Sequence, residues 1–277
     1  MTINSLDRII TQDFSGFFLI AGPCAVESKE VCMEVAVECS RIAQSLNIPF
    51  IFKSSFIKAN RTKKESFRTI GVGSAIEILR DLKTELEINV TTDVHETQDV
   101  ELVSSFVDLI QIPAFLSRQS ELIESAAKTG LPLNIKKGQF MNAAGMKHAV
   151  HKAEFAGASH VFLTERGNSF GYNHLVVDMP NINHMSKFSE AVIMDCTHAT
   201  QRPNEQSGIT GGDPDNTELL ARAALSVGAK GLFIETHPDP RQALSDGSNM
   251  IPLVEMEGLI KRLDRFSKTI NSVRWVM

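Results

Sequence analysis

Short apolar runs rich in Val, Ile, Leu and Phe alternate along the chain with longer segments whose apolar residues recur at helical spacing. The apolar runs predict strands at residues 17–23, 49–56, 89–94, 108–114, 131–137, 160–166, 190–197 and 231–237. The segments between them predict helices at 29–46, 73–86, 97–104, 118–128, 143–155, 216–227 and 254–270. Because the strands show no strict alternation of apolar and polar residues, we expect both of their faces to be covered, as in a parallel sheet.

About eight strand–helix units in 277 residues predict a (β/α)₈ TIM barrel, formed as one domain over residues 1–277. The same pattern is also compatible with an open, doubly wound parallel sheet. No linker, low-complexity segment or change of composition divides the chain. Residues 1–15 precede the first strand, and we expect them to form a short N-terminal extension.

The composition is that of an ordinary globular enzyme, with 43% hydrophobic and 22% charged residues. A formal net charge of -5 argues against a nucleic-acid partner and against an anionic membrane surface. No apolar run approaches the ~18 residues that span a bilayer, and the N-terminus lacks the basic and apolar regions of a signal peptide. Four cysteines are too few for a disulfide framework, so we expect a cytoplasmic protein.

A polar or ionisable side chain follows each predicted strand, at the end where a parallel barrel carries its active site. Five of these side chains are cations, namely Lys53, Lys58, Arg61, Lys136 and Arg166. A single lysine at a strand end is usually only solvated, but five cations gathered at the ends of three strands argue for a site. Arginine forks and lysine point charges together suit phosphate and carboxylate groups, so the pattern predicts anionic substrates.

One thiol, one imidazole and two carboxylates form a candidate coordination set of Cys24, His198, Glu235 and Asp246. The first three lie at or just after the ends of predicted strands. Taken singly, Cys24 has the properties of a small buried hydrophobe, and the two acids suit ion pairs with the cations. Taken together, the four side chains are able to close around a divalent metal ion.

Longer strings are more specific than any of these residues alone. They are AGPCAVES at 21–28, FKSSF at 52–56, KANR at 58–61, TDVHE at 92–96, QIPAFL at 111–116, KKGQF at 136–140, TERG at 164–167, FGYN at 170–173 and ETHPDP at 235–240. In this order, and over about residues 19–253, the chain resembles the family of 3-deoxy-D-manno-octulosonate 8-phosphate synthases.

The resemblance implies a homotetrameric barrel that condenses phosphoenolpyruvate with arabinose 5-phosphate and water. The products are 3-deoxy-D-manno-octulosonate 8-phosphate, which feeds lipopolysaccharide biosynthesis in Gram-negative bacteria, and inorganic phosphate. One branch of the family carries a metal-ligating cysteine after Gly-Pro, and the metal-independent branch carries asparagine there. Cys24 resembles the first branch, and the remaining ligands then match His198, Glu235 and Asp246. The thiolate and imidazole favour zinc or ferrous iron over magnesium.

The resemblance also implies roles for individual residues. The implied catalytic residues are Lys53, Asp93, Lys136, Asp195 and His198. Phosphoenolpyruvate would contact Lys53, Ser55, Gln111, Lys136 and Arg166, whereas the sugar phosphate would contact Lys58, Asn60, Arg61 and Thr62, with Arg61 on its phosphate. Asp93 and His95 would line the sugar end, and Phe115 would pack at the cavity and across a subunit contact.

Two segments, 62–73 and 202–215, depart from the family pattern, and the second is acidic at Asp213 and Asp215. Both fall where the sugar phosphate is expected, so the identity of the aldose stays open. The alternatives are a sister synthase that uses another aldose, such as erythrose 4-phosphate, and a catalytically silent sugar-phosphate-binding protein. The KANR string favours the octulosonate enzymes, and the retained cations and metal ligands argue against a silent protein.

Overall fold

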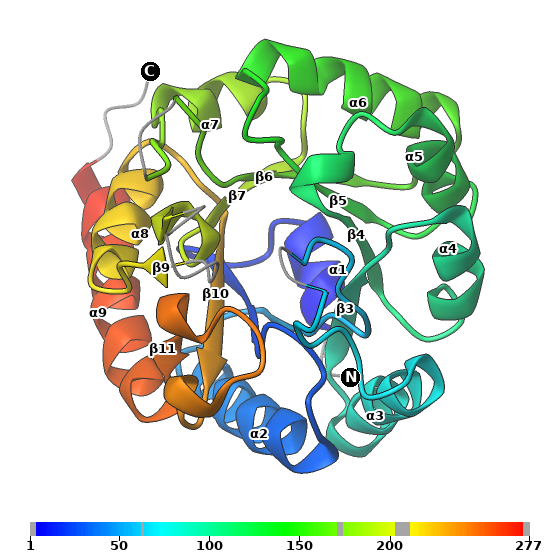
Figure 1. Ribbon diagram of the computed structural model, residues 1–277. Helices are drawn as coiled ribbons and strands as arrows, with labels where there is room; N and C mark the ends of the chain where they lie inside the picture. The colour runs from blue at the N-terminus through cyan, green and yellow to red at the C-terminus, as the bar shows by residue number, and fades with distance from the viewer. Residues whose placement is uncertain (1–3, 62–63, 171–173, 203–210, 274–277) are drawn as a thin grey trace.

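Eight parallel strands close into a barrel in the computed structural model, which describes residues 4–61, 64–170, 174–202 and 211–273 (Figure 1). The barrel strands are β1 (Phe18–Gly22), β2 (Phe50–Lys53), β3 (Asn89–Asp93), β4 (Leu109–Ile112), β5 (Leu133–Lys136), β6 (Val161–Glu165), β7 (Ala191–Asp195) and β10 (Gly231–His237). Each pairs with the next, and β10 pairs with β1 in parallel. This closure confirms the predicted TIM barrel and excludes the open sheet.

An outer ring of helices surrounds the strands (Figure 1). It consists of α2 (Lys29–Ser45), α3 (Val72–Leu86), α4 (Thr97–Val103), α5 (Ser120–Ala127), α6 (Ala143–Phe155), α7 (Pro180–Met185), α8 (Asn216–Ser226) and α9 (Leu253–Val273). All but α7 were predicted to within two or three residues. Helix α7 begins at a proline and has only six residues. It is therefore too short for its apolar residues to show a helical period in the sequence. None of the helices in the described part of the chain has the length and apolar character needed to cross a membrane.

Short elements decorate the carboxyl ends of the strands. The 3-10 turns are η1 (Ala114–Leu116), η2 (His198–Thr200), η3 (Pro240–Gln242) and η4 (Gly247–Asn249). Strands β8 (Gln201–Arg202) and β9 (Gly211–Gly212) form a small antiparallel ribbon, and β11 (Ile251–Pro252) pairs in parallel with the end of β10. The sequence pattern predicted none of these short pieces.

The N-terminal extension forms helix α1 (Ser5–Ile10), which lies inside the ring of strands in Figure 1. Its buried Leu6 and Ile9 pack against apolar side chains inside the barrel, among them Phe18, Phe162 and Phe233. The backbone amide of Leu6 also donates to the Asn89 side chain at 3.0 Å, which ties the helix to β3. The extension was predicted, but its role in closing the amino-terminal end of the barrel was not.

Strand residues are buried on both faces, as the unbroken apolar runs predicted. The outward-facing side chains pack under the helices, where Cys32 and Cys39 of α2 are also fully buried. The inward-facing side chains are apolar near the amino ends of the strands. Toward the carboxyl ends they become polar and charged, yet remain buried. That change marks the place of the site.

Candidate active site and metal centre

Buried charged side chains fill the carboxyl end of the barrel. Lys53, Asp93, Lys136 and Asp195 are the last residues of β2, β3, β5 and β7, and Glu235 lies on β10. Lys53 Nζ lies 3.0 Å from Glu235 Oε1 and 3.6 Å from Asp93 Oδ2. Lys136 Nζ lies 2.7 Å from Asp195 Oδ2 and also sits over the Phe233 ring. Each buried charge therefore has an opposite charge beside it, as burial of ions requires.

The two buried lysines differ in their electrostatic surroundings. Burial by itself lowers the pKa of Lys53, but the Glu235 and Asp93 carboxylates raise that pKa above its usual range. The pKa of Lys136 is lowered, chiefly by burial, although Asp195 opposes this shift. Burial disfavours ionised Asp93, yet Lys53, Lys58 and Lys136 hold its pKa well below the usual value. The opposite charges therefore favour the ionised forms of Lys53 and Asp93, whereas burial disfavours the ionised form of Lys136.

Four cations converge on one pocket at this end of the barrel, and none is more than 7% exposed. They are Lys53, Lys58, Lys136 and Arg166. The Arg166 Nη2 donates to the Gln201 side chain at 2.7 Å, whereas its buried Nη1 has no hydrogen-bond partner among the described residues. Buried donors normally find acceptors. A pocket with a spare guanidinium donor and three ammonium groups suits phosphate or carboxylate oxygens.

The other residues predicted for substrate binding fall into two groups. Asn60, His95 and Phe115 line the same pocket, and the His95 and Phe115 rings stack at a centroid separation of 6.2 Å. Ser55 and Gln111 are not among the lining residues of this pocket, and they bond to the two carboxylate oxygens of Asp93.

Arg61 and Thr62 complete the predicted set. Arg61 is outside the pocket wall and reaches Ser245 through Nη2, at 2.9 Å from the hydroxyl oxygen. Thr62 lies outside the described residues. The structure therefore brings the described members of the set to one end of the barrel, but only some of them to the pocket surface.

The four predicted metal ligands meet beside this pocket. Ligand atoms of Cys24, His198, Glu235 and Asp246 all lie within 4.8 Å of one another. Cys24 Sγ is 3.2 Å from Asp246 Oδ2, and His198 Nε2 is 3.6 Å from Glu235 Oε2. The buried Glu235 Oε2 has no hydrogen-bond partner in the described parts of the chain. Sulfur, nitrogen and two carboxylates at this spacing fit a divalent metal ion.

Asp195 orients the histidine of this cluster. Its Oδ2 lies 2.9 Å from His198 Nδ1, and its Oδ1 accepts from the His198 backbone amide at 2.9 Å. With Nδ1 held there, Nε2 faces Glu235 and the centre of the cluster. A carboxylate behind a histidine is the usual support of a metal-binding imidazole. Asp195 thus touches both Lys136 and His198, a double contact that the sequence did not reveal.

Backbone geometry brings Cys24 to the cluster. A Cβ at Gly22 would lie 2.0 Å from the Lys53 backbone oxygen, so glycine allows β1 and β2 to converge just before Cys24. Burial raises the pKa of the Cys24 thiol well above its usual range, and Glu235 adds to that rise. Because metals bind the thiolate, loading a metal here must displace the thiol proton.

Two further residues hold the loop that carries Asp246. Glu27 Oε1 accepts from the Leu244 backbone amide at 2.7 Å, and the Ser245 hydroxyl lies 3.1 Å from Cys24 Sγ. Neither residue was predicted as functional. Glu27 stands in the quoted string at 21–28, which offered a signal, whereas Ser245 had none apart from its place beside Asp246.

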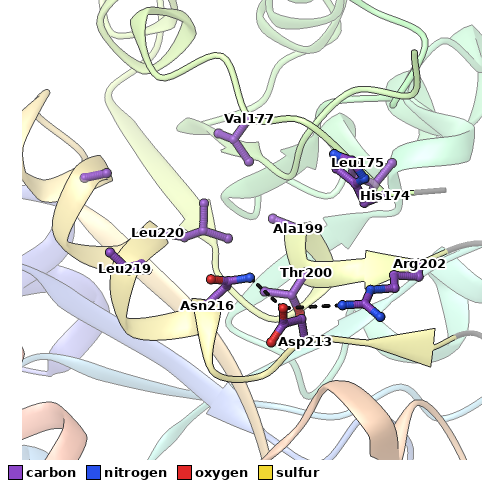
Figure 2. Close-up of a pocket in the computed structure, with 11 residues that line it drawn as sticks. His174, Leu175, Val177, Ala199, Thr200, Arg202, Asp213, Asn216, Leu219 and Leu220 are labelled. Carbon is purple, nitrogen blue, oxygen red and sulfur yellow. Dashed lines mark hydrogen bonds and ion pairs between the residues drawn. The ribbon is translucent and has the colours of Figure 1, made fainter. Parts of the chain in front are cut away.

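A second pocket lies between α8 and the segment that leads to α7 (Figure 2). Leu219, Leu220 and Val177 form apolar walls, and Arg202 is the single Lys or Arg among its lining residues. Arg202 lies 3.5 Å from Asp213, which also accepts from the Asn216 side chain at 2.8 Å. Asp213 is therefore paired with Arg202 nearby. This pocket has one Lys or Arg in its lining, whereas the pocket at the carboxyl end of the barrel has four.

Comparison with known proteins matches residues 2–271 to the model of the DAHP synthetase I family. The 2-dehydro-3-deoxyphosphooctonate aldolase of Nitrosococcus oceani is 46% identical over 255 residues, which cover 92% of this chain and 91% of that protein. The enzyme of the same name from Dichelobacter nodosus is 47% identical over 247 residues, 89% of each chain. The one from Polaromonas sp. is 47% identical over 261 residues, 91% of this chain and 92% of the relative.

Proposed function

The chain belongs to the DAHP synthetase I family, and from this premise we propose that it condenses phosphoenolpyruvate with arabinose 5-phosphate and water. The products are 3-deoxy-D-manno-octulosonate 8-phosphate, a precursor for lipopolysaccharide biosynthesis, and inorganic phosphate. The name of the relatives, 2-dehydro-3-deoxyphosphooctonate aldolase, designates this synthase. The observation that carries the proposal is the convergence of four buried cations on one pocket beside the four-ligand cluster.

The reaction requires fixed positive charge at several oxygens. C3 of phosphoenolpyruvate forms a bond to the aldehyde carbon of the sugar, whose oxygen takes up a proton. Water adds at C2, and the C2 phosphate leaves as inorganic phosphate. Lys53, Lys136 and Arg166 would hold the phosphate and carboxylate of phosphoenolpyruvate, where preorganised cations stabilise the developing charge without reorganisation.

The sugar phosphate would occupy the other side of the pocket. Lys58 and Asn60 line the pocket, and Arg61 is outside the lining with its guanidinium at Ser245. Thr62 follows in the chain and would add a hydroxyl. Asp93 and His95 would meet the sugar hydroxyls. Two phosphates near one another need such a concentration of cations, because they would otherwise repel each other.

Ser55, Gln111 and Asp195 would act mainly by positioning. Ser55 and Gln111 hold both oxygens of Asp93, and Asp195 holds both Lys136 and His198. A polar network in which each member is bonded keeps the charged groups in one arrangement. These contacts support a positioning role for the three residues over the direct contacts implied by resemblance.

We further propose zinc or ferrous iron as the metal, held by Cys24, His198, Glu235 and Asp246. An ion held by these residues would supply Lewis-acid polarisation of a sugar oxygen or a bound water of lowered pKa. Asp195 holds His198 Nδ1, so that Nε2 faces the ligand cluster. Glu235 Oε2 lies 3.6 Å from that Nε2 and faces the same cluster.

The alternative functions are not favoured. The relatives that match over about nine-tenths of the chain carry the octonate name, which supports arabinose 5-phosphate over erythrose 4-phosphate. The buried ion pairs Lys53–Glu235 and Lys136–Asp195 at the carboxyl end of the barrel argue against a catalytically silent binding protein. The single domain of residues 1–277, the homotetramer and the cytoplasmic location stay predictions.

One experiment tests the proposed function. The purified protein is analysed for bound metal, and phosphate release from phosphoenolpyruvate is measured with arabinose 5-phosphate or erythrose 4-phosphate, with and without a chelator. We expect turnover with arabinose 5-phosphate that the chelator abolishes and added metal restores. Turnover with erythrose 4-phosphate alone would reassign the aldose, and full activity after metal removal would refute the metal.

A further inference from the structure

We propose that Ser245 is a positioning residue that links the phosphate-binding Arg61 to the thiolate of Cys24. This link would make the metal centre sensitive to the sugar phosphate. Ser245 is 3% exposed, and its hydroxyl oxygen lies 2.9 Å from Arg61 Nη2 and 3.1 Å from Cys24 Sγ. The proposal rests on the proposed function, because Arg61 and Cys24 have their assigned roles only there.

The chemistry of Arg61 fixes the direction of the first hydrogen bond. A guanidinium has only donors, so Arg61 must donate and the Ser245 oxygen must accept. The single hydroxyl hydrogen of Ser245 then has two acceptors within reach, Cys24 Sγ at 3.1 Å and Asp246 Oδ2 at 3.4 Å. A thiolate has no proton to donate, so in the metal-loaded protein Cys24 Sγ would accept from Ser245. A directed chain would then run from Arg61 through Ser245 to the sulfur.

The loop that carries Ser245 is anchored where this chain needs it. Glu27, three residues after Cys24, accepts from the Leu244 amide at 2.7 Å, and its other oxygen lies 3.4 Å from His237 Nε2. The segment that bears the thiol and the loop that bears the hydroxyl are thereby tied together. Ser245 is held against the sulfur by contacts outside the cluster itself.

Hydrogen bonds in a row polarise one another. An arabinose 5-phosphate dianion on Arg61 would withdraw the guanidinium donor from Ser245 or weaken it, and the bond from Ser245 to the thiolate would change with it. By reciprocity, a ligand that alters metal binding has its own affinity altered by metal to the same degree. The residues that hold the metal and those that hold the sugar phosphate would therefore respond to each other.

Cobalt(II) in the metal-depleted full-length protein provides a readout other than activity. The thiolate-to-cobalt absorption band is followed during titration, with and without arabinose 5-phosphate. In the unsubstituted protein we expect the sugar phosphate to shift the band. Ser245→Ala should weaken cobalt binding about tenfold, as loss of a support for a ligand usually does, and should abolish the shift. Arg61→Met should also abolish the shift, while leaving cobalt affinity within about threefold.

Thr236→Val is the matched control, because the Thr236 hydroxyl is buried at the same end of the barrel but donates to the Ile251 carbonyl. It should leave cobalt affinity and the shift unchanged. Unaltered cobalt affinity in Ser245→Ala, or a shift that persists in it, overturns the proposal. No turnover with arabinose 5-phosphate, combined with Ser245-dependent cobalt affinity, would refute the proposed function and support the role of Ser245. A protein that binds no cobalt refutes the metal assignment and the role of Ser245, whereas turnover with arabinose 5-phosphate tests the proposed reaction separately.

Discussion

The two ends of the barrel interior are built from the same strands but from opposite kinds of side chain. Near the amino ends, Phe18, Ile51 and Phe162 pack with α1 into a closed apolar plug. Near the carboxyl ends, Lys53, Lys136 and their partners form a buried ionic network around a pocket. One strand can supply both, as β2 does with Ile51 and, two residues later, Lys53, since alternate side chains point inward.

This contrast separates what stabilises the fold from what performs the chemistry. Burial of apolar surface in the plug contributes roughly 25 cal/mol per Å². Burial of each ion at the carboxyl end of the barrel, which we call the mouth, costs several kcal/mol before pairing offsets it. The buried charges at the mouth are therefore explained by binding and catalysis rather than by stability. Substitutions at the two ends should accordingly have different effects.

The largest effect is expected at Lys136. Lys136→Met removes a cation that faces the pocket and deprives Asp195 of its lysine partner, while the contact of Asp195 with His198 remains. We expect kcat/KM for phosphate release to fall by about 10³-fold, since one preorganised charge-stabilising donor is worth roughly that much. Steady-state kinetics with both substrates varied would measure the loss.

Lys137 provides the matched control for this prediction. Lys137 is the next residue in the chain and is also buried, but it is not among the pocket's lining residues. Its Nζ pairs with Glu165 Oε1 at 3.2 Å. Lys137→Met should lower the unfolding temperature while keeping kcat within about tenfold. Equal kinetic losses in both variants would mean that buried ion pairs, rather than the charge in the pocket, govern activity.

The next effect should appear in stability at the opposite end. Phe18→Ala opens a cavity in the plug, where the Phe18 ring lies 5.8 Å from that of Phe14 and 6.4 Å from that of Phe162. We expect the free energy of unfolding to fall by about 3 kcal/mol, the low end for such truncations, because α1 is able to settle into the space. Urea denaturation measures this. Metal content and kcat of the folded fraction should not change, and a loss of metal would show that the two ends are coupled.

The contrast was only partly predictable from sequence. Unbroken apolar runs identified the strands, and the polar residues after them identified the mouth, because the chain order of a parallel barrel sends every strand end to the same face. The plug was missed because the six-residue α1 is too short for a helical period, and Leu6 and Ile9 are buried only through contacts far away in sequence. Tertiary packing, not local preference, makes that helix.

Within the site, the residue types were predictable but their partners were not. Gln111 and Ser55 were expected at the substrate, a prediction that stays open, but their bonds to Asp93 were not foreseen. Ser245 meets Cys24 across 221 positions of sequence, and no local pattern signals such a contact. The four metal ligands could be grouped in advance because thiol, imidazole and carboxylates at strand ends have a shared chemistry.

An intermediate effect is expected at Cys24. Cys24→Asn replaces the thiolate ligand with the residue of the metal-independent branch that the sequence resembles. We expect metal affinity to fall about 100-fold, or roughly 2.7 kcal/mol, with part of the activity kept in the presence of a chelator. Cys39→Ser alters another fully buried thiol, in α2, and should leave the metal content unchanged. A variant with no activity under any condition would show that the thiolate does more than hold the ion.

The smallest effect is expected for charges outside the barrel altogether. Glu218 on α8 bridges to α9 through Arg262, at 2.7 Å, and also pairs with Arg222; Arg262 is 54% exposed in its side chain. Hydrogen bonds from Arg262 and Arg222 lower the pKa of Glu218. A lowered carboxyl pKa contributes stability above the unfolded value of about 4.3, and that contribution is lost as the pH falls through the folded pKa. Glu218→Gln should therefore lower the free energy of unfolding by about 0.5–1 kcal/mol at neutral pH, because exposed pairs are screened, and by less at pH near 3.

Urea denaturation at both pH values measures the effect of Glu218→Gln, with the exposed Glu101→Gln of α4 as control. An equal loss of stability at both pH values would mean that Glu218 stabilises the fold by packing. A loss as large as that of Phe18→Ala would mean that exposed ion pairs stabilise this fold as much as buried apolar contacts do, against the comparison of the two barrel ends.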